Sequence, residues 1–256
     1  MTQAVDHMPQ IGVIGFGAFG RFLCETLAHH ADIGVCDQRD IAEEARQIGV
    51  AALDLAEVAA RPIVVIAVTV NHFEEVLASA AKLITPGAIV VDVASVKMRP
   101  IELMQRHLPA QCDILGTHPL FGAQTAGALG GIAGQPIAFC PVRISDMQRV
   151  DRIRAFLAET LGLRVVEIGP EEHDREMARV QALTHLIGHA AVEMDLPESP
   201  LATLAYTRLL ELKRNMANHS ADLFHTIQGD NPYAAEARRA LRDALDRLES
   251  RIDRDS

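Results

Sequence analysis

The most constraining feature of this chain is a glycine-rich turn between an apolar run and a helical pattern. The apolar run covers residues 10–14, the helical pattern covers residues 21–29, and the turn between them reads Gly15-Phe16-Gly17-Ala18-Phe19-Gly20. In such a turn the first glycine allows the sharp bend, the second lets a pyrophosphate approach the backbone, and the third lets helix and strand pack closely. The helix N-terminus adds free N–H groups and a dipole that favour anions. The six residues of the turn are therefore predicted to bind the phosphates of a dinucleotide.

An acidic residue stands where such a site meets the adenosine ribose. A second apolar run at residues 32–36 is followed by Asp37, which lies 22 residues after Gly15. A carboxylate at this distance accepts hydrogen bonds from the ribose hydroxyls of NAD, although the pattern also fits an exposed turn aspartate. Arg39 could instead meet the 2′-phosphate of NADP. The sequence favours NAD over NADP. Val68, which ends the next apolar run, and Thr69, which follows it, are added to the expected cofactor contacts.

The order of apolar runs predicts the fold class. Runs at residues 62–68 and 88–93 are continuous, as expected for strands buried on both faces, and they alternate with helical patterns. Two later runs complete a parallel sheet of about seven strands, whereas only helical patterns follow Gly169. We expect an α/β Rossmann-type domain over residues 1–168 and an all-α helical domain over residues 169–256.

The composition narrows the class of protein. The 256 residues carry a net charge of −10, which argues against a nucleic-acid or anionic-membrane surface. No apolar run approaches the ~18 residues of a membrane span, and no export signal opens the chain. The four cysteines are scattered without a C-x-x-C pair, so neither zinc nor a disulfide framework is expected. We expect a cytoplasmic protein that binds a small molecule and no metal.

A histidine and a serine are the candidates for chemistry. Residues 113–115 predict a short strand, so His118 is expected at or just past the carboxyl edge of the sheet, where ligands bind. Histidine takes or gives a proton near neutral pH. Ser95 follows the run at residues 88–93 and is expected at the same edge. The alternatives are a histidine bonded inside a structural turn and a serine that only caps a helix.

Taken together, the motifs resemble the prephenate/arogenate dehydrogenase family of tyrosine biosynthesis. The similarity runs from about residue 10 to residue 230, and it rests on G-F-G-A-F-G at 15–20, D-V-A-S-V-K at 92–97, G-T-H-P-L-F-G at 116–122, E-H-D at 172–174 and Q-A-L-T-H at 181–185. The first motif is generic, and the others are specific. The resemblance implies a helical domain that dimerises, a homodimer, and an active site between the two domains.

The resemblance also implies a reaction. The family oxidises a cyclohexadienol: hydride leaves ring C4 for the nicotinamide, a base draws the hydroxyl proton, and loss of CO₂ makes the ring aromatic. His118 would be that base, and Ser95 would orient both the hydroxyl and the imidazole. Because neutral imidazole must accept the proton, an acidic limb is expected in the rate profile.

Substrate contacts follow from the resemblance residue by residue. The family pattern implies Gln124, Thr125, Gln181 and His185. Read without the resemblance, Gln124 and Thr125 fit a shaped loop and Gln181 fits a helix surface. His185 lies four residues after Gln181, so the two would share one helix face.

The choice of substrate depends on charges in the helical domain. Many relatives grip a carboxylate with a late arginine, for which Lys213 and Arg214 are the nearest candidates here, although both could be solvated. Arogenate users carry an acid at the position aligned with His219, where it would pair with the ammonium group. His219 cannot supply that charge, which favours prephenate.

Two other classes remain open. A β-hydroxyacid or imine dehydrogenase with the same layout would place its acid or base, a lysine or aspartate, in the helical domain. A non-catalytic NAD(P)-sensing protein would not need Ser95 and His118 together.

Overall fold

The computed structural model describes residues 8–255, and the chain forms two compact units. One unit ends at Pro170 and the other begins at Glu171, two residues after the boundary expected from the sequence. The first seven residues of the expected nucleotide-binding domain lie outside the described residues.

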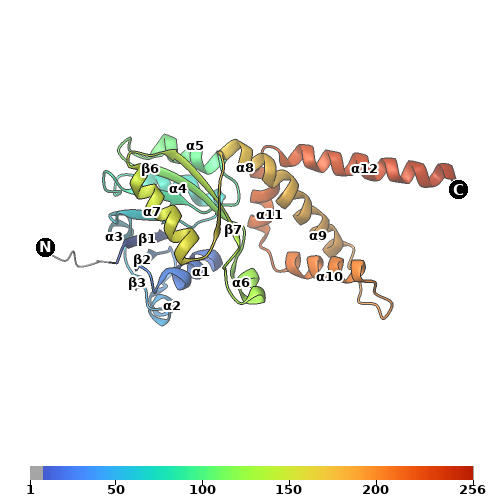
Figure 1. Cartoon of the computed structure of the whole chain (residues 1–256), viewed down its shortest axis with the longest axis horizontal. Coiled ribbons are helices and arrows are strands. Elements are labelled where there is room, and N and C mark those ends of the chain that lie inside the picture. The colour runs from blue at the N-terminus through green and yellow to red at the C-terminus, as the bar shows by residue number, and fades with distance from the viewer. Residues whose placement is uncertain (1–7, 256) are drawn as a thin grey trace. The chain divides into compact units, whose positions relative to one another are not determined.

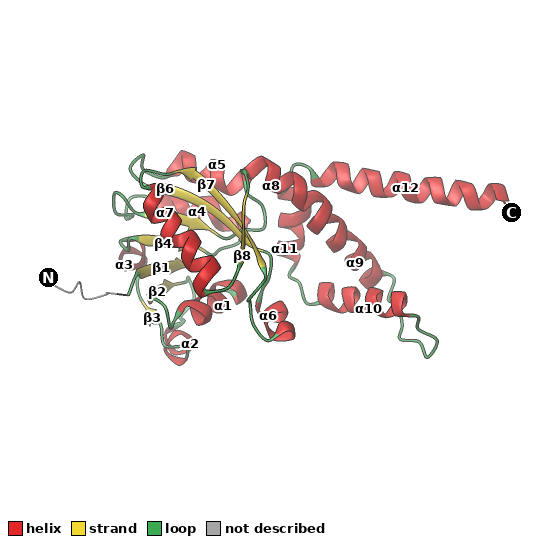
Figure 2. Ribbon diagram, in the orientation of Figure 1, coloured by secondary structure: helices red, strands yellow, loops and turns green. Residues whose placement is uncertain are grey.

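The first unit is built on a sheet of eight strands within the described residues (Figure 2). The strands are β1 (Gln10–Ile14), β2 (Asp32–Cys36), β3 (Ala51–Ala52), β4 (Ile63–Ile66), β5 (Ile89–Asp92), β6 (Asp113–Pro119), β7 (Pro136–Arg143) and β8 (Arg164–Glu167). Their order is β3-β2-β1-β4-β5-β6-β7-β8, and its first six places follow the order of dinucleotide-binding sheets. The expected Rossmann-type fold is confirmed.

The structure differs in two details from the expected parallel sheet of about seven strands. β7 pairs antiparallel with β6, and the two-residue strand β3 adds an eighth member. An apolar run reports burial on both faces and carries no information on strand direction, so the reversal at β7 could not be read from it. β3 is too short to give any periodic signal.

Helices cover both faces of this sheet (Figure 1). They are α1 (Ala18–Leu27), α2 (Ala42–Gln47), α3 (Leu55–Ala59), α4 (Val70–Ala80), α5 (Met98–His107), α6 (Ala123–Leu129) and α7 (Met147–Ala155), which continues into a π-helical turn, η1 (Phe156–Thr160). Neighbouring residues of one strand enter different cores: Val64 packs with Phe73 and Leu103, whereas Val65 packs with Cys24 and Val150. The alternation of strand side chains thus produces two separate cores.

The second unit contains helices joined by loops, and no strand occurs among its described residues. It contains α8 (Pro170–Met177), η2 (Ala178–Ala182), α9 (Leu183–Glu193), α10 (Leu204–Ala217), α11 (Ala221–His225), η3 (Thr226–Asp230) and α12 (Ala234–Asp255), where η2 and η3 are π-helical turns. Its small apolar core joins Ala182, Ile227 and Ala234, with Leu223 packed against them. α9 and α10 are in close contact at Gly188, because a Cβ there would overlap Met216 and lie 3.0 Å from Cγ of Leu212.

The Gly188 contact gives a stability prediction. Gly188→Ala is expected to lower the free energy of unfolding by about 1–3 kcal/mol, because the added methyl group forces α9 and α10 apart. The matched control is Gly127→Ala in α6, where a Cβ meets nothing within 4 Å; helix propensity there should leave stability equal or raise it by up to about 1 kcal/mol. Urea-induced unfolding followed by circular dichroism measures both, and equal midpoints for the two variants would contradict the close contact.

Candidate active site

The glycine-rich turn has the geometry that a nucleotide phosphate requires. Gly15 has φ +105°, and a Cβ there would lie 2.5 Å from the carbonyl oxygen of Ala67. A Cβ on Gly20 would overlap the carbonyl oxygen of Gly15, whereas one on Gly17 would meet nothing within 4 Å. The first and third glycines are thus fixed by packing, and the second leaves open space for a ligand. α1 begins at Ala18, three residues before the expected start, so its N-terminus lies inside the motif that contains Phe19.

Asp37 is tied to this turn by backbone hydrogen bonds. Its Oδ2 accepts from the amide of Phe16 at 2.7 Å, and its Oδ1 accepts from the amide of Arg39 at 3.0 Å. The Arg39 guanidinium donates to the Phe16 carbonyl at 3.2 Å and lies 3.5 Å from Glu44. Asp37 and Arg39, the two charged residues predicted for the nucleotide site, therefore lie on one turn. Hydrogen bonds to the backbone orient both side chains.

The loop after β4 borders the same turn. Cγ1 of Val68 would lie 2.9 Å from a Cβ on Gly15, and Thr69 is the N-cap residue of α4. Ala67, which the sequence analysis did not single out, contacts the positions of both Gly15 and Gly20. A small residue near the end of an apolar run was the signal that could have identified it. The residues present fit a dinucleotide.

His118 was expected at or just past the carboxyl edge of the sheet, and it lies inside β6, one residue before the end of the strand. The strand runs to Pro119, and His118 is 3% exposed and pairs with Ala138 of β7. β5 supports β6 only as far as Gly116, and the antiparallel β7 supports it further. The reversal of β7 therefore lengthens β6 past the point where the parallel neighbour ends.

Ser95 and His118 lie near the ends of neighbouring strands, Ser95 after β5 and His118 within β6. Asp92, the last residue of β5, pairs with Gly116, so the loop with Ser95 begins beside the segment with His118. Ser95 is half-buried. Gln124 and Thr125 lie in the first turn of α6, a helix and not a shaped loop; Gln124 is exposed and Thr125 half-buried. Phe121 meets Phe22 of α1 edge-on, with ring centroids 6.3 Å apart.

In the helical unit, His185 belongs to a cluster of imidazoles. The rings of His185 and His219 are stacked with centroids 4.9 Å apart, and His189 lies 6.4 Å from His185 and 4.4 Å from Phe224. Each of the three imidazoles has a buried nitrogen without a hydrogen-bond partner: Nδ1 of His185, Nε2 of His189 and Nδ1 of His219. Sequence reasoning missed His189, although its spacing of four residues from His185 places both on one helix face. Gln181 lies half-buried in η2, one turn before His185.

Burial favours the neutral form of His185 and His219. Desolvation, with smaller effects of His219 and His189, lowers the pKa of His185 to about 4. Burial first, and His189 second, also lower the pKa of His219. At pH 7 the imidazoles of His185 and His219 offer lone pairs and N–H groups, and they offer no positive charge to a substrate carboxylate.

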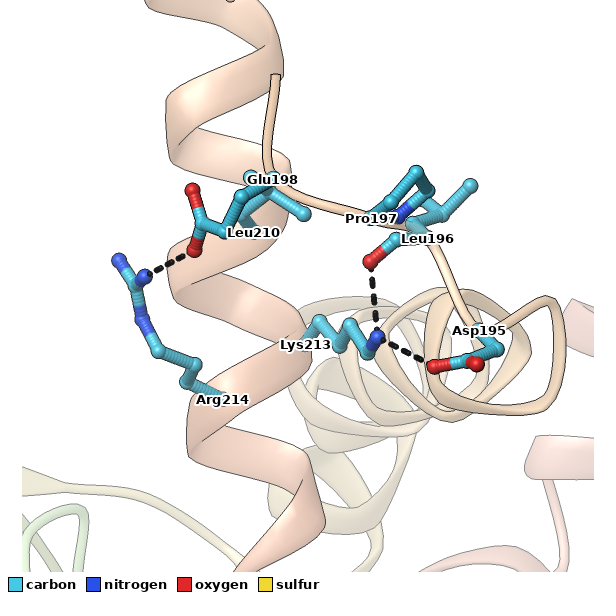
Figure 3. Close-up of a pocket in the computed structure, with 7 residues that line it drawn as sticks. All are labelled: Asp195, Leu196, Pro197, Glu198, Leu210, Lys213 and Arg214. Carbon is cyan, nitrogen blue, oxygen red and sulfur yellow. Dashed lines mark hydrogen bonds and ion pairs between the residues drawn. The ribbon is translucent and has the colours of Figure 1, made fainter. Parts of the chain in front are cut away.

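Lys213 and Arg214 both have acidic partners in the same unit (Figure 3). Lys213 Nζ donates to Oδ1 of Asp195 at 3.1 Å and to the carbonyl of Leu196 at 2.8 Å, and Arg214 lies 3.1 Å from Glu198. With Pro197 and Leu210 they line a pocket of about 390 Å³. A substrate carboxylate would have to displace a protein carboxylate, so the expected grip by either cation stays a prediction.

Within the described residues, no group of three or more His, Cys, Asp or Glu side chains is arranged to hold a metal ion. None of the helices between residues 8 and 255 has both the length and the apolarity to cross a membrane.

The imidazole cluster gives a pH prediction. The folded-state pKa of His185 is below the ordinary 6.5, so between pH 6.5 and 4 the unfolded chain binds a proton that the folded chain does not. The contribution of His185 to the free energy of unfolding is therefore fully present above pH 6.5. It is lost as the pH falls toward 4, by up to about 3 kcal/mol. Urea unfolding at pH 7 and pH 4.5 should show a smaller loss for His185→Phe than for the wild type. An identical loss in both proteins would show that His185 is not the group responsible.

The comparisons with known proteins agree with this architecture. The family model "Prephenate dehydrogenase, nucleotide-binding domain" matches residues 19–167, and the model "TYRAAT1-like, C-terminal domain" matches residues 190–256. Arogenate dehydrogenase 2, chloroplastic, of Arabidopsis thaliana is 34% identical over 89% of this chain and 65% of its own length. The 4-amino-4-deoxyprephenate dehydrogenase of Streptomyces pristinaespiralis is 30% identical over 94% of this chain and 83% of its own.

A solved structure extends the likeness to both units. The prephenate dehydrogenase of A. aeolicus, in complex with hydroxyphenyl propionate and NAD⁺, has a TM-score of 0.77 at 19% identity, and the match covers 98% of this chain and 93% of that one. Against three curated relatives, this chain spans 39 to 65% of their length. The motifs, the strand order and these matches show that the chain belongs to the prephenate dehydrogenase family.

Proposed function

We propose that this protein catalyses the NAD-dependent oxidative decarboxylation of prephenate to 4-hydroxyphenylpyruvate, with arogenate to tyrosine as the second candidate. The observation that carries the proposal is a single row across the sheet. Cys36, Ile14, Ile66, Asp92 and Gly116 pair successively across parallel strands. Every candidate residue of the first unit follows this row, at the carboxyl edge where ligands bind in such sheets.

The row fixes the order in which the candidate residues lie along the carboxyl edge of the sheet. Asp37, Gly15 and Val68 follow the strands of the nucleotide side, Ser95 follows β5, and His118 lies one residue before the end of β6. A nucleotide on the glycine-rich turn can thus extend along the edge toward a buried histidine. This arrangement suits hydride transfer next to a general base.

His118 would act twice on one oxygen. Hydride leaves C4 of the substrate for the nicotinamide, and the imidazole of His118 accepts the proton of the 4-hydroxyl, so C4 becomes a carbonyl carbon. The bond between the ring and its carboxylate then breaks, CO₂ leaves, and the electron pair passes through the ring to the carbonyl oxygen. The imidazolium of His118 can return its proton to that oxygen, and Ser95 would hold the oxygen and the imidazole in register.

Support for NAD comes from Asp37. Its carboxylate is fixed by two backbone amides and suits the ribose hydroxyls, while its charge opposes a 2′-phosphate. NADP remains the alternative through Arg39, whose side chain is 57% exposed although it already contacts Asp37 and Glu44.

The choice of substrate depends on the helical unit, where we propose contacts from Gln181, His185 and His219. Prephenate is favoured because His219 supplies no carboxylate for an ammonium group. Arogenate is favoured by a different observation: Nδ1 of His219 is buried without a partner, and a neutral imidazole nitrogen can accept a hydrogen bond from an ammonium group. The names of two Arabidopsis relatives also refer to arogenate.

Initial rates test the proposal. Prephenate, arogenate and 4-amino-4-deoxyprephenate are each combined with NAD and NADP, and prephenate with NAD is expected to give the highest kcat/KM. His118→Asn should lower kcat by about 10²–10⁴-fold with nucleotide binding retained, because the base is lost while the site remains. Ser95→Ala should have a smaller effect, and His72→Asn, a change at an exposed position of α4, should have none.

The contrary outcomes are distinct. Nucleotide binding without turnover of any substrate would favour the NAD(P)-sensing class. Turnover of a β-hydroxyacid or an imine alone would favour the other dehydrogenase class. Higher activity with arogenate than with prephenate would favour binding of the arogenate ammonium group by the imidazole cluster.

We further propose a homodimer formed through α12. Its apolar residues Leu241, Leu245, Leu248 and Ile252 are spaced by four, three and four, which is the seam of a two-helix coiled coil. Leu245 and Leu248 are 55% and 51% exposed, and arginines alternate with acids beside them. A second copy of the chain would supply the matching seam.

Light scattering after size exclusion tests the dimer. The wild type is expected to be a dimer and the variant Leu245→Glu/Leu248→Glu a monomer, because four like charges would meet in the seam. Ser250→Glu, on the opposite side of α12, should remain dimeric. A monomeric wild type would refute the proposal.

The cytoplasmic location expected from the sequence stays a prediction, since two plant relatives are named as chloroplastic.

A further inference from the structure

A fully buried ion pair lies at the carboxyl edge of the sheet. The side chains of Lys97 and Asp92 are both 0% exposed, and Nζ of Lys97 donates to Oδ1 of Asp92. Nζ also donates to the carbonyl oxygen of Thr117 at 2.6 Å. The same Oδ1 accepts from the amide of Ala94 at 2.9 Å. The sequence analysis quoted this motif without giving either residue a role.

The pair joins the two segments that carry the candidate catalytic groups. Asp92 ends β5 and Lys97 is the N-cap residue of α5, so their contact closes the loop that contains Ser95. Thr117 directly precedes His118, and its Oγ1 donates to the carbonyl of Asp92 at 2.7 Å. Lys97 therefore fixes the peptide group that joins Thr117 to His118. Asp92 fixes the same threonine a second time, through its hydroxyl.

The packing leaves little freedom at this point. A Cβ on Gly116, which pairs with Asp92, would lie 3.2 Å from Oδ2 of Asp92 and 2.9 Å from Cδ1 of Ile101. Thr117 is itself buried, with 4% exposure. A shift of the Asp92 carboxylate would thus be passed to the strand that carries His118.

Stability alone is a weak reason for such a pair. Removing two charges from water costs several kcal/mol per ion, and replacing a whole buried pair by uncharged groups is often neutral or stabilising. A buried lysine is more useful here for what it orients. Its three donors can fix a carboxylate and a backbone carbonyl together.

We propose that Lys97 and Asp92 are positioning residues that set the separation between Ser95 and the imidazole of His118. Lys97 acts through the Thr117 carbonyl on the backbone of His118, and the closed loop acts on Ser95. The inference rests on the proposed function, because the two groups act together only if the proposed reaction takes place.

The alternative is a pair that only stabilises the sheet, and a double variant separates the two roles. Lys97→Met leaves the Asp92 carboxylate buried without its cation, so it should lower stability strongly. Asp92→Asn/Lys97→Met removes both charges and keeps an acceptor for the Ala94 amide, so stability should return. The Thr117 carbonyl still lacks its donor in the double variant. Lys82→Met, at an exposed position, is the matched control.

The experiment compares stability, nucleotide binding and kinetics in these proteins. In the double variant we expect urea stability and NAD affinity close to wild type, and kcat lowered about 100-fold, the effect of misplacing a reacting group by roughly 1 Å. The primary isotope effect on kcat, measured with substrate deuterated at C4, should rise as hydride transfer becomes limiting. A reduced fraction of folded enzyme would not change that ratio.

Nuclear magnetic resonance of ¹⁵N-labelled histidine side chains gives a readout without turnover. The His118 signals should move in the double variant, and those of His185 and His219 should not. A double variant with wild-type kcat, isotope effect and His118 signals would overturn the positioning role and leave the proposed function intact. A wild type that turns over no substrate would refute the proposed function and the positioning role with it.

Discussion

The lateral register of the parallel strands is the constraint on which the candidate site depends. Ile14, Ile66, Asp92 and Gly116 are paired in one row, so each chain leaves the sheet at the same level. A slip of one residue in a strand would turn its side chains to the opposite face and exchange the two cores. The backbone hydrogen bonds that hold the row thus also hold the glycine-rich turn, the Ser95 loop and the His118 segment at one edge.

The Lys97–Asp92 pair and the His185–His219 stack place polar groups out of water in opposite ways. In the sheet unit, Lys97 and Asp92 are buried as a charged pair with further hydrogen bonds, which offset part of the cost of desolvation. In the helical unit, His185 is buried and His219 half-buried, neither has an acidic partner among its ring contacts, and burial lowers the pKa of both. A charged pair orients its neighbours at neutral pH, whereas neutral imidazoles keep lone pairs and N–H groups available to a ligand.

Much of the site could be inferred from local sequence because local chemistry specifies it. The turn at Gly15 needs a positive φ, and Gly20 needs the absence of a Cβ, so both requirements are visible as glycines. His118 could be assigned to the carboxyl edge from the strand before it. Its place inside β6 could not, because the extra length comes from β7, which lies about twenty residues later and pairs in reverse. His189 was missed for a similar reason: its ring contact with Phe224 joins α9 to α11.

The sequence by itself determined the elements whose signals are short-range: the glycine-rich turn, the buried strands around it, the change to helices after Gly169 and the motifs that mark the family. Only the tertiary structure decided which of those residues act on one another. The bond from Lys97 to the Thr117 carbonyl spans twenty residues, and the stacking of His185 on His219 spans thirty-four. Such contacts follow from strand register and helix packing. Both are decided by the free energy of the whole fold, which no local sequence pattern records.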